Sequence, residues 1–354
     1  MRCHWARGVL CLAAVLTSFL FYPVAAAGRI FSSKLSLSFS ADGRQIAVGG
    51  RGLRIFDVAT GQLLETFGDP HQDLFTCVLC SPTDTSLIAA GVHGKGFKLF
   101  RRGSADPIVE YRTNQPLNRE AIFRKDGQRL LTSSGRTDNA DLRKYQLCEW
   151  DVTSGKQIRS LEREGEIRAL AVSPNGRRLA FCSRGNVEVL DFETWDVFGA
   201  AELPLGEFIA NPRVTTAVFA ADDGPLHLFG IASLPAPPNG VNTSTRWVVD
   251  FEKDVMLHRE TTSGALFGVG TANRDAIIEV FDEPGQGQTV RSRLENGHVQ
   301  WRFQTPFRWK EMTSPYSIQV SPDGKWVAWC NGDAVCLLDA ETGTDLRTIE
   351  VSDE

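Results

Sequence analysis

LSLSFSADGRQIAVGGRGLRIFDVATGQLLETF, residues 35–67, is the stretch of this chain that decides its fold. Apolar and polar residues alternate at its start, and two turns, Ala41-Asp42-Gly43 and Ala59-Thr60-Gly61, interrupt the apolar segments that follow. Alternation predicts half-buried β-strands, and Gly beside Asp or Thr predicts tight turns between them. The predicted strands are 35–39, 46–48, 53–56 and 63–67.

This unit recurs along almost the whole chain. Positions equivalent to Gly61 recur at intervals of 40 to 59 residues, at Ala105, Gly155, Trp195, Asp254, Gly297 and Gly343. The first turn recurs as Asp126-Gly127, Asn175-Gly176, Asp223-Gly224 and Asp323-Gly324. Each interval has room for four short strands, and seven units fill residues 28–354. The sequence therefore predicts an all-β fold, a seven-bladed β-propeller of four-stranded antiparallel blades.

Particular segments also carry a family resemblance. Val172-Ser173-Pro174-Asn175-Gly176, Val320-Ser321-Pro322-Asp323-Gly324 and the Trp150-Asp151 pair resemble the WD-repeat propeller family. Gly68-Asp69-Pro70-His71 is similar to the Gly-His element of that family, which implies a structural role for His71. Only one unit keeps the Trp-Asp pair in register and only one keeps a candidate His, since Trp195-Asp196 falls in a turn. The chain thus resembles a divergent, exported, bacterial-type member, and the resemblance implies no specific partner.

How the ring closes is a separate expectation. The last unit contains four predicted strands of its own, the fourth at 345–351, so the first and last units need not share strands. Residues 29–33 could add to the last blade and cover its edge.

The N-terminal segment is typical of a signal peptide. Arg2 and Arg7 precede an apolar stretch, 8–22, and small residues follow, which predicts cleavage after Ala27. An uncleaved membrane anchor over 8–28 is the alternative. The predicted domains are a signal peptide, 1–27, and a propeller, 28–354, in the periplasm or secreted. Cleavage would move the formal charge from -5 to -7 by removing two Arg, and an acidic body argues against a nucleic-acid partner.

Six cysteines would remain after cleavage, at Cys77, Cys80, Cys148, Cys182, Cys330 and Cys336. An even number permits disulfides without requiring them. Cys77 and Cys80 stand three apart on one predicted strand and should face opposite sides of it. Cys330 and Cys336 flank a tight turn and are the pair best placed to form a bridge, and buried free thiols are the alternative.

Insertions point to one face of the predicted ring. The turns between first and second strands and between third and fourth strands are short and lie on one face. The other face receives the insertions 68–75, 134–146, 233–246 and 305–315. Loops on a rigid scaffold are where binding usually resides, and Trp and Arg often anchor interfaces. Candidate partner-binding residues are Phe307, Arg308, Trp309, Lys310, His71 and Asp73. Packing of Phe307 and Trp309 over a blade edge is the alternative.

Enzyme motifs are missing from the sequence. It has no Gly-x-Ser-x-Gly elbow, no His-Glu-x-x-His and no paired Cys-x-x-Cys knuckles, so we expect no catalytic residues, metal or cofactor. The leading hypothesis is a monomeric, exported, non-enzymatic propeller that binds a protein or peptide on its loop-rich face. A propeller hydrolase or oxidoreductase, with a metal or cofactor at the channel mouth, and a purely structural envelope protein are the alternatives.

Overall fold

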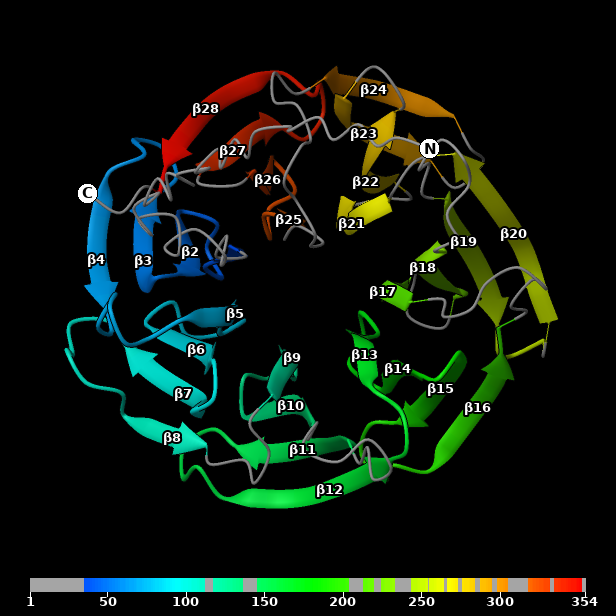
Figure 1. Ribbon diagram of the computed structural model, residues 1–354, viewed down its shortest axis with the longest axis horizontal. Helices are drawn as coiled ribbons and strands as arrows, with labels where there is room; N and C mark the ends of the chain where they lie inside the picture. The colour runs from blue at the N-terminus through cyan, green and yellow to red at the C-terminus, as the bar shows by residue number, and fades with distance from the viewer. Residues whose placement is uncertain are drawn as a thin grey trace, which may run out of the picture. The chain divides into compact units, whose positions relative to one another are not determined.

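A computed structural model describes residues 35–111, 117–135, 145–203, 213–219, 224–232, 243–253, 255–263, 266–272, 276–283, 287–294, 298–304, 318–331 and 334–351. The chain divides into two units, Met1–Ser32 and Ser33–Glu354, and the first lies outside the described residues. Every regular element described in the second unit is a β-strand, and the strands form seven four-stranded antiparallel sheets (Figure 1). The seven-bladed β-propeller predicted from the sequence is confirmed.

Each blade consists of four strands that are consecutive in the chain, the first near the ring centre and the fourth at the periphery (Figure 1). Blades 1 to 4 comprise β1 (Ser36–Phe39), β2 (Gln45–Gly50), β3 (Gly52–Asp57), β4 (Leu63–Phe67); β5 (Phe75–Cys80), β6 (Leu87–Val92), β7 (Gly96–Arg101), β8 (Val109–Tyr111); β9 (Leu117–Phe123), β10 (Arg129–Gly135), β11 (Tyr145–Asp151), β12 (Gln157–Arg163); and β13 (Ile167–Val172), β14 (Arg178–Ser183), β15 (Asn186–Asp191), β16 (Val197–Glu202). Blades 5 to 7 comprise β17 (Arg213–Phe219), β18 (Leu226–Ala232), β19 (Thr243–Asp250), β20 (Val255–Ser263); β21 (Leu266–Ala272), β22 (Ala276–Glu283), β23 (Gly287–Leu294), β24 (Val299–Gln304); and β25 (Ile318–Val320), β26 (Trp326–Asn331), β27 (Ala334–Asp339), β28 (Asp345–Glu350).

In blades 1, 4 and 7 the turn between the first and second strands is held by a Ser and an Asp or Asn. In blade 1, Ser40 Oγ donates to Asp42 Oδ1 at 2.6 Å and accepts from the Gln45 amide at 3.0 Å. The same Ser-to-carboxylate or Ser-to-amide contact occurs at Ser173 with Asn175 and at Ser321 with Asp323. Short polar side chains that bind nearby backbone groups favour such turns, so this part of the repeat is structural.

The turn between the third and fourth strands repeats more closely. Asp57 Oδ1 accepts from the amide and hydroxyl of Thr60 at 2.7 and 2.8 Å, and the Gly61 amide donates to the Asp57 carbonyl. The same arrangement joins Asp151 to Ser154, Asp191 to Thr194 and Asp339 to Thr342. Gly61 has φ +74, a left-handed conformation that favours Gly, and this explains the Thr-Gly signature. Trp195 occupies the equivalent position in blade 4 with φ +65.

The hydrophobic core lies between blades. Both faces of most sheets are apolar, and the buried clusters join each blade to the next. The cluster between blades 1 and 2, for example, contains Ile55, Phe67, Phe75 and Phe100, all almost fully buried. Since each blade buries its faces only against its neighbours, the fold needs the complete ring.

Among the described strands, blades 7 and 1 share none. Their core cluster includes Leu37 and Phe39 from blade 1 and Val335 and Leu337 from blade 7. Arg347 of β28 donates to the carbonyls of Thr60 and Ala59 at 2.5 and 2.8 Å. The expectation that the last unit supplies all four of its strands is therefore confirmed, whereas residues 29–33 lie outside the described residues.

Outer strands contact the turn between the third and fourth strands of the next blade at several interfaces. A Cβ added at Gly155 would lie 2.5 Å from Val109 of β8, and one added at Gly343 would lie 2.5 Å from the Trp301 ring of β24. Trp301 Nε1 also donates to the Ala340 carbonyl at 3.0 Å. The Gly at these turns therefore serves two needs, a left-handed φ and room for the neighbouring blade.

The predicted bridge between Cys330 and Cys336 is wrong. All six described cysteines are free thiols. Cys330 pairs in register with Val335, so Cys336 lies one position further along and faces the opposite side of the sheet. Cys330 packs in the core shared with blade 1 and Cys336 in the core shared with blade 6. The alternative, buried free thiols, is confirmed for this pair.

Cys77 and Cys80 lie on opposite faces of β5, as the strand spacing predicts. Cys77 packs toward blade 3 and Cys80 toward blade 1. Burial raises the pKa of each thiol to about 12, so neither is a ready nucleophile at neutral pH.

Candidate functional site

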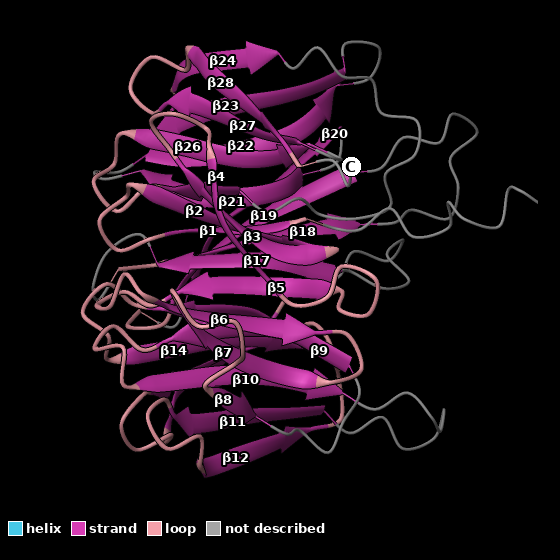
Figure 2. Cartoon of the chain, turned by 90° about the vertical axis from the view of Figure 1, so that its left-hand side faces the viewer, coloured by secondary structure: helices cyan, strands magenta, loops and turns pink. Residues whose placement is uncertain are grey.

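The two faces of the ring differ in the length of their connections. Antiparallel order places the first-to-second and third-to-fourth connections on one face, here called the turn face, and all others on the opposite, loop face (Figure 2). Between the described strands, every connection longer than seven residues joins strand ends on the loop face: 136–144, 203–212, 233–242 and 305–317. The asymmetry agrees with the sequence prediction, although the sequence missed 203–212.

Two predicted insertions have different bounds in the structure. Strand β10 ends at Gly135 and β11 begins at Tyr145, so the connection between them is shorter than predicted. Arg246, placed by the prediction at the end of a loop, lies within β19 and is 7% exposed. The strand begins at Thr243 because the residues from 243 onward pair with both β18 and β20, so Arg246 belongs to the strand and not to the loop.

Of the predicted binding residues, His71 and Asp73 are described. Both lie on the link between blades 1 and 2, on the loop face. His71 is exposed, and its amide donates to Asp69 Oδ1 at 2.8 Å. Asp73 is 9% exposed and accepts from Lys95 Nζ at 2.8 Å and from the Asp69 amide at 3.2 Å. Asp73 thus braces the link against blade 2, whereas the side chain of His71 is available at the surface.

The other four candidates, Phe307, Arg308, Trp309 and Lys310, lie outside the described residues. The segment that contains them connects Gln304 of β24 to Ile318 of β25. Both strand ends are on the loop face, the same face as His71.

Side chains also link the inner strands around the ring centre. Ser36 and Ser38 of β1 accept from the amides of Val78 and Cys80 at 3.0 and 2.9 Å. In the same way, Glu120 Oε2 of β9 accepts from the Leu170 amide of β13 at 2.9 Å. These contacts are structural, because each satisfies a backbone donor of the next blade.

Glu120 is the ionisable member of this series. Burial raises its pKa, and hydrogen bonds from the amides of Leu170 and Ala169 partly offset that effect. Ala169 has φ +55, so its backbone is held in the left-handed region beside the carboxylate. No local sequence pattern predicts this contact, because it joins residues fifty positions apart.

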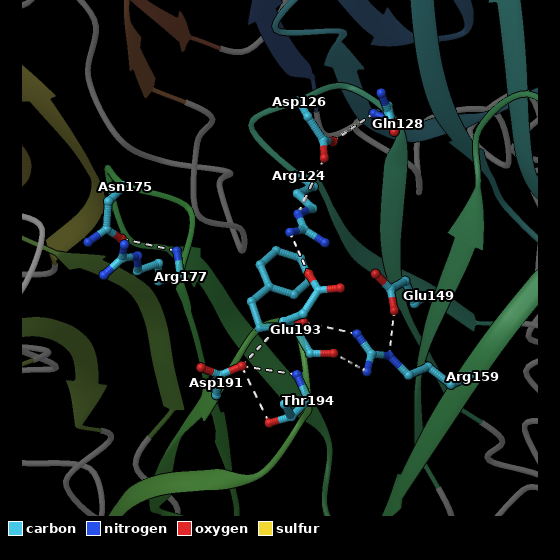
Figure 3. Close-up of polar contacts among 11 residues, drawn as sticks. Arg124, Asp126, Gln128, Glu149, Arg159, Asn175, Arg177, Asp191, Glu193 and Thr194 are labelled. Atoms are coloured by element: carbon cyan, nitrogen blue, oxygen red, sulfur yellow. Dashed lines mark hydrogen bonds and ion pairs between the residues drawn. The ribbon is translucent and has the colours of Figure 1, made fainter.

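A polar cluster on the turn face joins blades 3 and 4 (Figure 3). Arg159 of β12 donates to the buried Glu149 carboxylate at 2.5 Å and to the Glu193 and Phe192 carbonyls at 2.7 and 2.9 Å. Arg124 donates to the Glu193 carboxylate at 2.6 Å. Asp191 caps the same turn. The cluster satisfies the carbonyls of the turn in blade 4 from the neighbouring blade, much as Arg347 does between blades 7 and 1.

His227 is the described histidine with a strongly shifted pKa. It is 2% exposed, and its Nδ1 lies 2.7 Å from Arg246 Nη2. Burial, with the nearby Arg246 charge, lowers its pKa to about 4, so it is neutral at physiological pH. Its side chain is buried on β18 of blade 5, beside Arg246 of β19.

Among the residues that the structure describes, no three His, Cys, Asp or Glu side chains lie together as metal ligands would. In the same part of the chain no helix has the length and apolar character needed to span a membrane.

Comparison with known proteins extends only to the fold. No family model matches the chain, and no curated protein matches its sequence. Many solved structures match, among them a chain of the hydrazine synthase of Kuenenia stuttgartiensis, with a TM-score of 0.69 and 12% identity over 90% of this chain and 99% of that chain. The similarity shows the propeller fold alone. No family match supports the WD-repeat resemblance in particular.

Proposed function

We propose that this chain is a non-catalytic propeller that binds a protein or peptide through its loop face. The observation that carries the proposal is the unequal distribution of connections: all those longer than seven residues leave strand ends on that face. A rigid ring of paired strands holds the ends of these connections in fixed positions, which is how binding loops are usually supported. The exposed His71 on the braced 68–74 link lies on the same face.

Several of the polar groups described on the turn face are already bound within the fold. The Asp and Thr side chains of the third-to-fourth turns bind their own backbone, and Arg124, Arg159 and Arg347 bind the next blade. Groups used in this way offer fewer donors and acceptors to a ligand. The loop face is therefore the better candidate for recognition.

The non-catalytic part of the proposal rests on the described titratable groups. Burial raises the pKa of each described thiol, and His227 is neutral inside blade 5. None of these groups is activated as a nucleophile or base would be. Elemental analysis of the purified protein tests this part: about one metal per chain would favour the enzyme hypothesis instead.

Export and a WD-repeat relationship also belong to the proposal. The apolar N-terminal segment and its small residues support cleavage after Ala27, and N-terminal sequencing of the mature protein should begin at Gly28. A chain that retains Met1 and partitions with membranes would show the anchor instead. The repeated Asp-x-x-Thr-Gly turns support the family relationship.

Capture from the protein's own envelope extract tests the binding surface. Replacing Arg308 and Trp309 together by Ala should weaken capture of the main partner by about 2 kcal/mol, the scale of an interface anchor. Arg177, exposed on the turn face, supplies the matched control, and Arg177→Ala should leave capture unchanged. Equal loss in both variants, or no loss in the first, would contradict the placement on the loop face.

A further inference from the structure

Arginine–aromatic contacts concentrate on blade 4. Four of the five such contacts recorded among the described residues involve an aromatic ring of this blade. Phe181 and Phe192 are buried, whereas Trp195 and Phe198 lie on the outer hairpin β15–β16. Arg159 is 4.6 Å from the centre of the Trp195 ring, and Arg178 is 3.9 Å from that of Phe198. The outer hairpin therefore carries two rings in contact with guanidinium groups: Phe198, which is exposed, and Trp195, which is half-buried against the core shared with blade 3.

Trp195 occupies a position that the tight turns of blades 1, 3 and 7 give to Gly. Gly61, Gly155 and Gly343 have φ between +68 and +74 there, and Trp195 adopts φ +65 despite its side chain. A large residue in this conformation is strained, and such strain persists only when surrounding contacts hold it. The stack with Arg159 supplies that contact, and it places an aromatic ring at the rim.

Apolar side chains extend this surface over three successive outer strands. Val197 is 58% exposed, Ile158 46%, Phe198 43% and Val255 42%. Val197 and Phe198 lie on β16, Ile158 on β12 and Val255 on β20. These three strands are neighbours at the periphery of the ring (Figure 1). Phe251, in the turn before β20, packs where a Cβ of Gly199 would lie, so blade 5 is in contact with β16. We name Ile158, Trp195, Val197, Phe198 and Val255 the blade-4 patch.

The edge of β16 lacks the charges that usually block pairing of an outer strand. Its sequence, Val197-Phe198-Gly199-Ala200-Ala201-Glu202, has no charge before the last residue. The outer strands of the other blades each carry a charge in their interior or at their start, such as Glu65, Glu110, Arg302 and Arg347. A charge-free edge is open to a further strand.

The surroundings of the patch are acidic. Asp191, Asp196 and Glu202 are exposed around it, and the exposed Glu193 is paired with Arg124. The two stacked arginines are paired with carboxylates, Arg159 with Glu149 and Arg178 with Glu252, and Lys253 is paired with Asp250. The charge left for a partner is thus mainly negative, which disfavours nucleic acid and a second acidic copy of this chain.

We propose that the outer edge of blade 4 docks an extended, basic segment of another protein, which pairs with β16 and places apolar side chains on the blade-4 patch. Main-chain pairing would supply affinity, and the stacked rings and acidic rim would select apolar residues interspersed with Lys or Arg. This surface is separate from the loop face, so it does not depend on the function proposed above.

Two synthetic peptides test the proposal directly. The first alternates Lys with Val around a central Trp over about ten residues, and the second replaces each Lys with Glu. Fluorescence anisotropy of labelled peptides with the full mature chain should show that the Lys peptide binds at least about tenfold more tightly, and that added salt weakens it. Equal affinity for both peptides, or no binding at about 1 mM protein, would overturn the proposal.

Equivalent positions in blade 1 supply matched controls. Phe198 and Leu64 are both 43% exposed and occupy the same bulge in their outer strands. Ala200 and Thr66 are both exposed, two residues further along. Phe198→Ser and Ala200→Lys should each weaken binding of the Lys peptide by about tenfold or more, and Leu64→Ser and Thr66→Lys should leave it unchanged.

Equal losses in the blade-1 variants would overturn the assignment to blade 4. Sedimentation of the mature chain tests whether a second copy of the chain covers this edge instead. A dimer that Ala200→Lys dissociates would show that it does, and would also overturn the proposal. Circular dichroism of each variant shows that the ring is intact before binding is compared.

Discussion

Two glycines with the same backbone conformation isolate the contribution of packing between blades. Gly343 lies in the tight turn of blade 7 with φ +71, and Gly94 lies between β6 and β7 with φ +72. A Cβ at Gly343 would lie 2.5 Å from two ring atoms of Trp301 in the neighbouring blade. A Cβ at Gly94 would have no atom within 4 Å among those described. The pair therefore differs in neighbours and not in φ.

The expected effects follow from this difference. A left-handed φ costs a residue with a Cβ about 1–2 kcal/mol, and replacing Gly returns about 0.4–1 kcal/mol by restricting the unfolded chain. Gly94→Ala should thus lower the free energy of unfolding by about 1 kcal/mol or less. Gly343→Ala adds overpacking against Trp301, which is 8% exposed and held by its bond to the Ala340 carbonyl, for a total loss of about 2–4 kcal/mol.

Urea unfolding followed by tryptophan fluorescence and far-UV circular dichroism measures both losses. Gly61→Ala provides an intermediate case, because the nearest atom, at 3.0 Å, belongs to the flexible Arg347 side chain. The expected order of loss is Gly343, then Gly61, then Gly94. Equal losses for Gly343→Ala and Gly94→Ala would refute the reasoning that the outer strand of one blade packs on the turn of the next.

Three further predictions concern titratable groups. Hydrogen bonds from Thr194 lower the pKa of Asp191, and equivalent bonds from Thr342 lower that of Asp339. The stability that these carboxylates contribute above pH 3.8 should be lost as the pH falls below that value. The melting temperature, recorded from about pH 5 to about pH 2, measures this loss. Burial raises the pKa of Glu120 above 4.5, so its charge opposes folding at neutral pH. The Glu120→Gln variant should therefore unfold at an equal or higher urea concentration at about pH 7. The Glu120→Ala variant removes the acceptor for the Leu170 amide and should lose about 1–3 kcal/mol of unfolding free energy. Burial raises the pKa of the Cys330 thiol, so it should resist iodoacetamide at pH 8 in the folded protein and react after unfolding, and a mass two units low under non-reducing conditions would contradict the free thiols.

The sequence predicted the features that depend on local chemistry. Gly61, Gly155 and Gly343 mark turns because a left-handed φ favours Gly, and the Asp three residues before Thr or Ser caps the same turn. Those signals were enough to count seven blades and to assign the two faces. Trp195 fell at the same position in the count, and the structure shows that it adopts the same φ without being Gly.

Features that depend on strand register or on distant residues could not be predicted. The facing of Cys330 and Cys336 is set by the register of β26 with β27, in which a shift of one residue exchanges the two faces of the sheet. Arg159 reaches the Glu193 carbonyl from another blade, and Glu120 reaches the Leu170 amide fifty residues away. Nothing in the local sequence of these residues marks such contacts. Of the binding residues predicted on the loop face, the structure describes His71 and Asp73 and assigns a bracing role to Asp73.

Cross-linking of the captured complex, read by mass spectrometry, tests the central claim most directly. Recognition through the loop face predicts partner cross-links to the 68–74 and 305–317 connections, together with loss of those cross-links in the Arg308 and Trp309 variant. Cross-links confined to the turns at 40–44, 173–177 and 321–325 would place the partner on the opposite face and contradict the account.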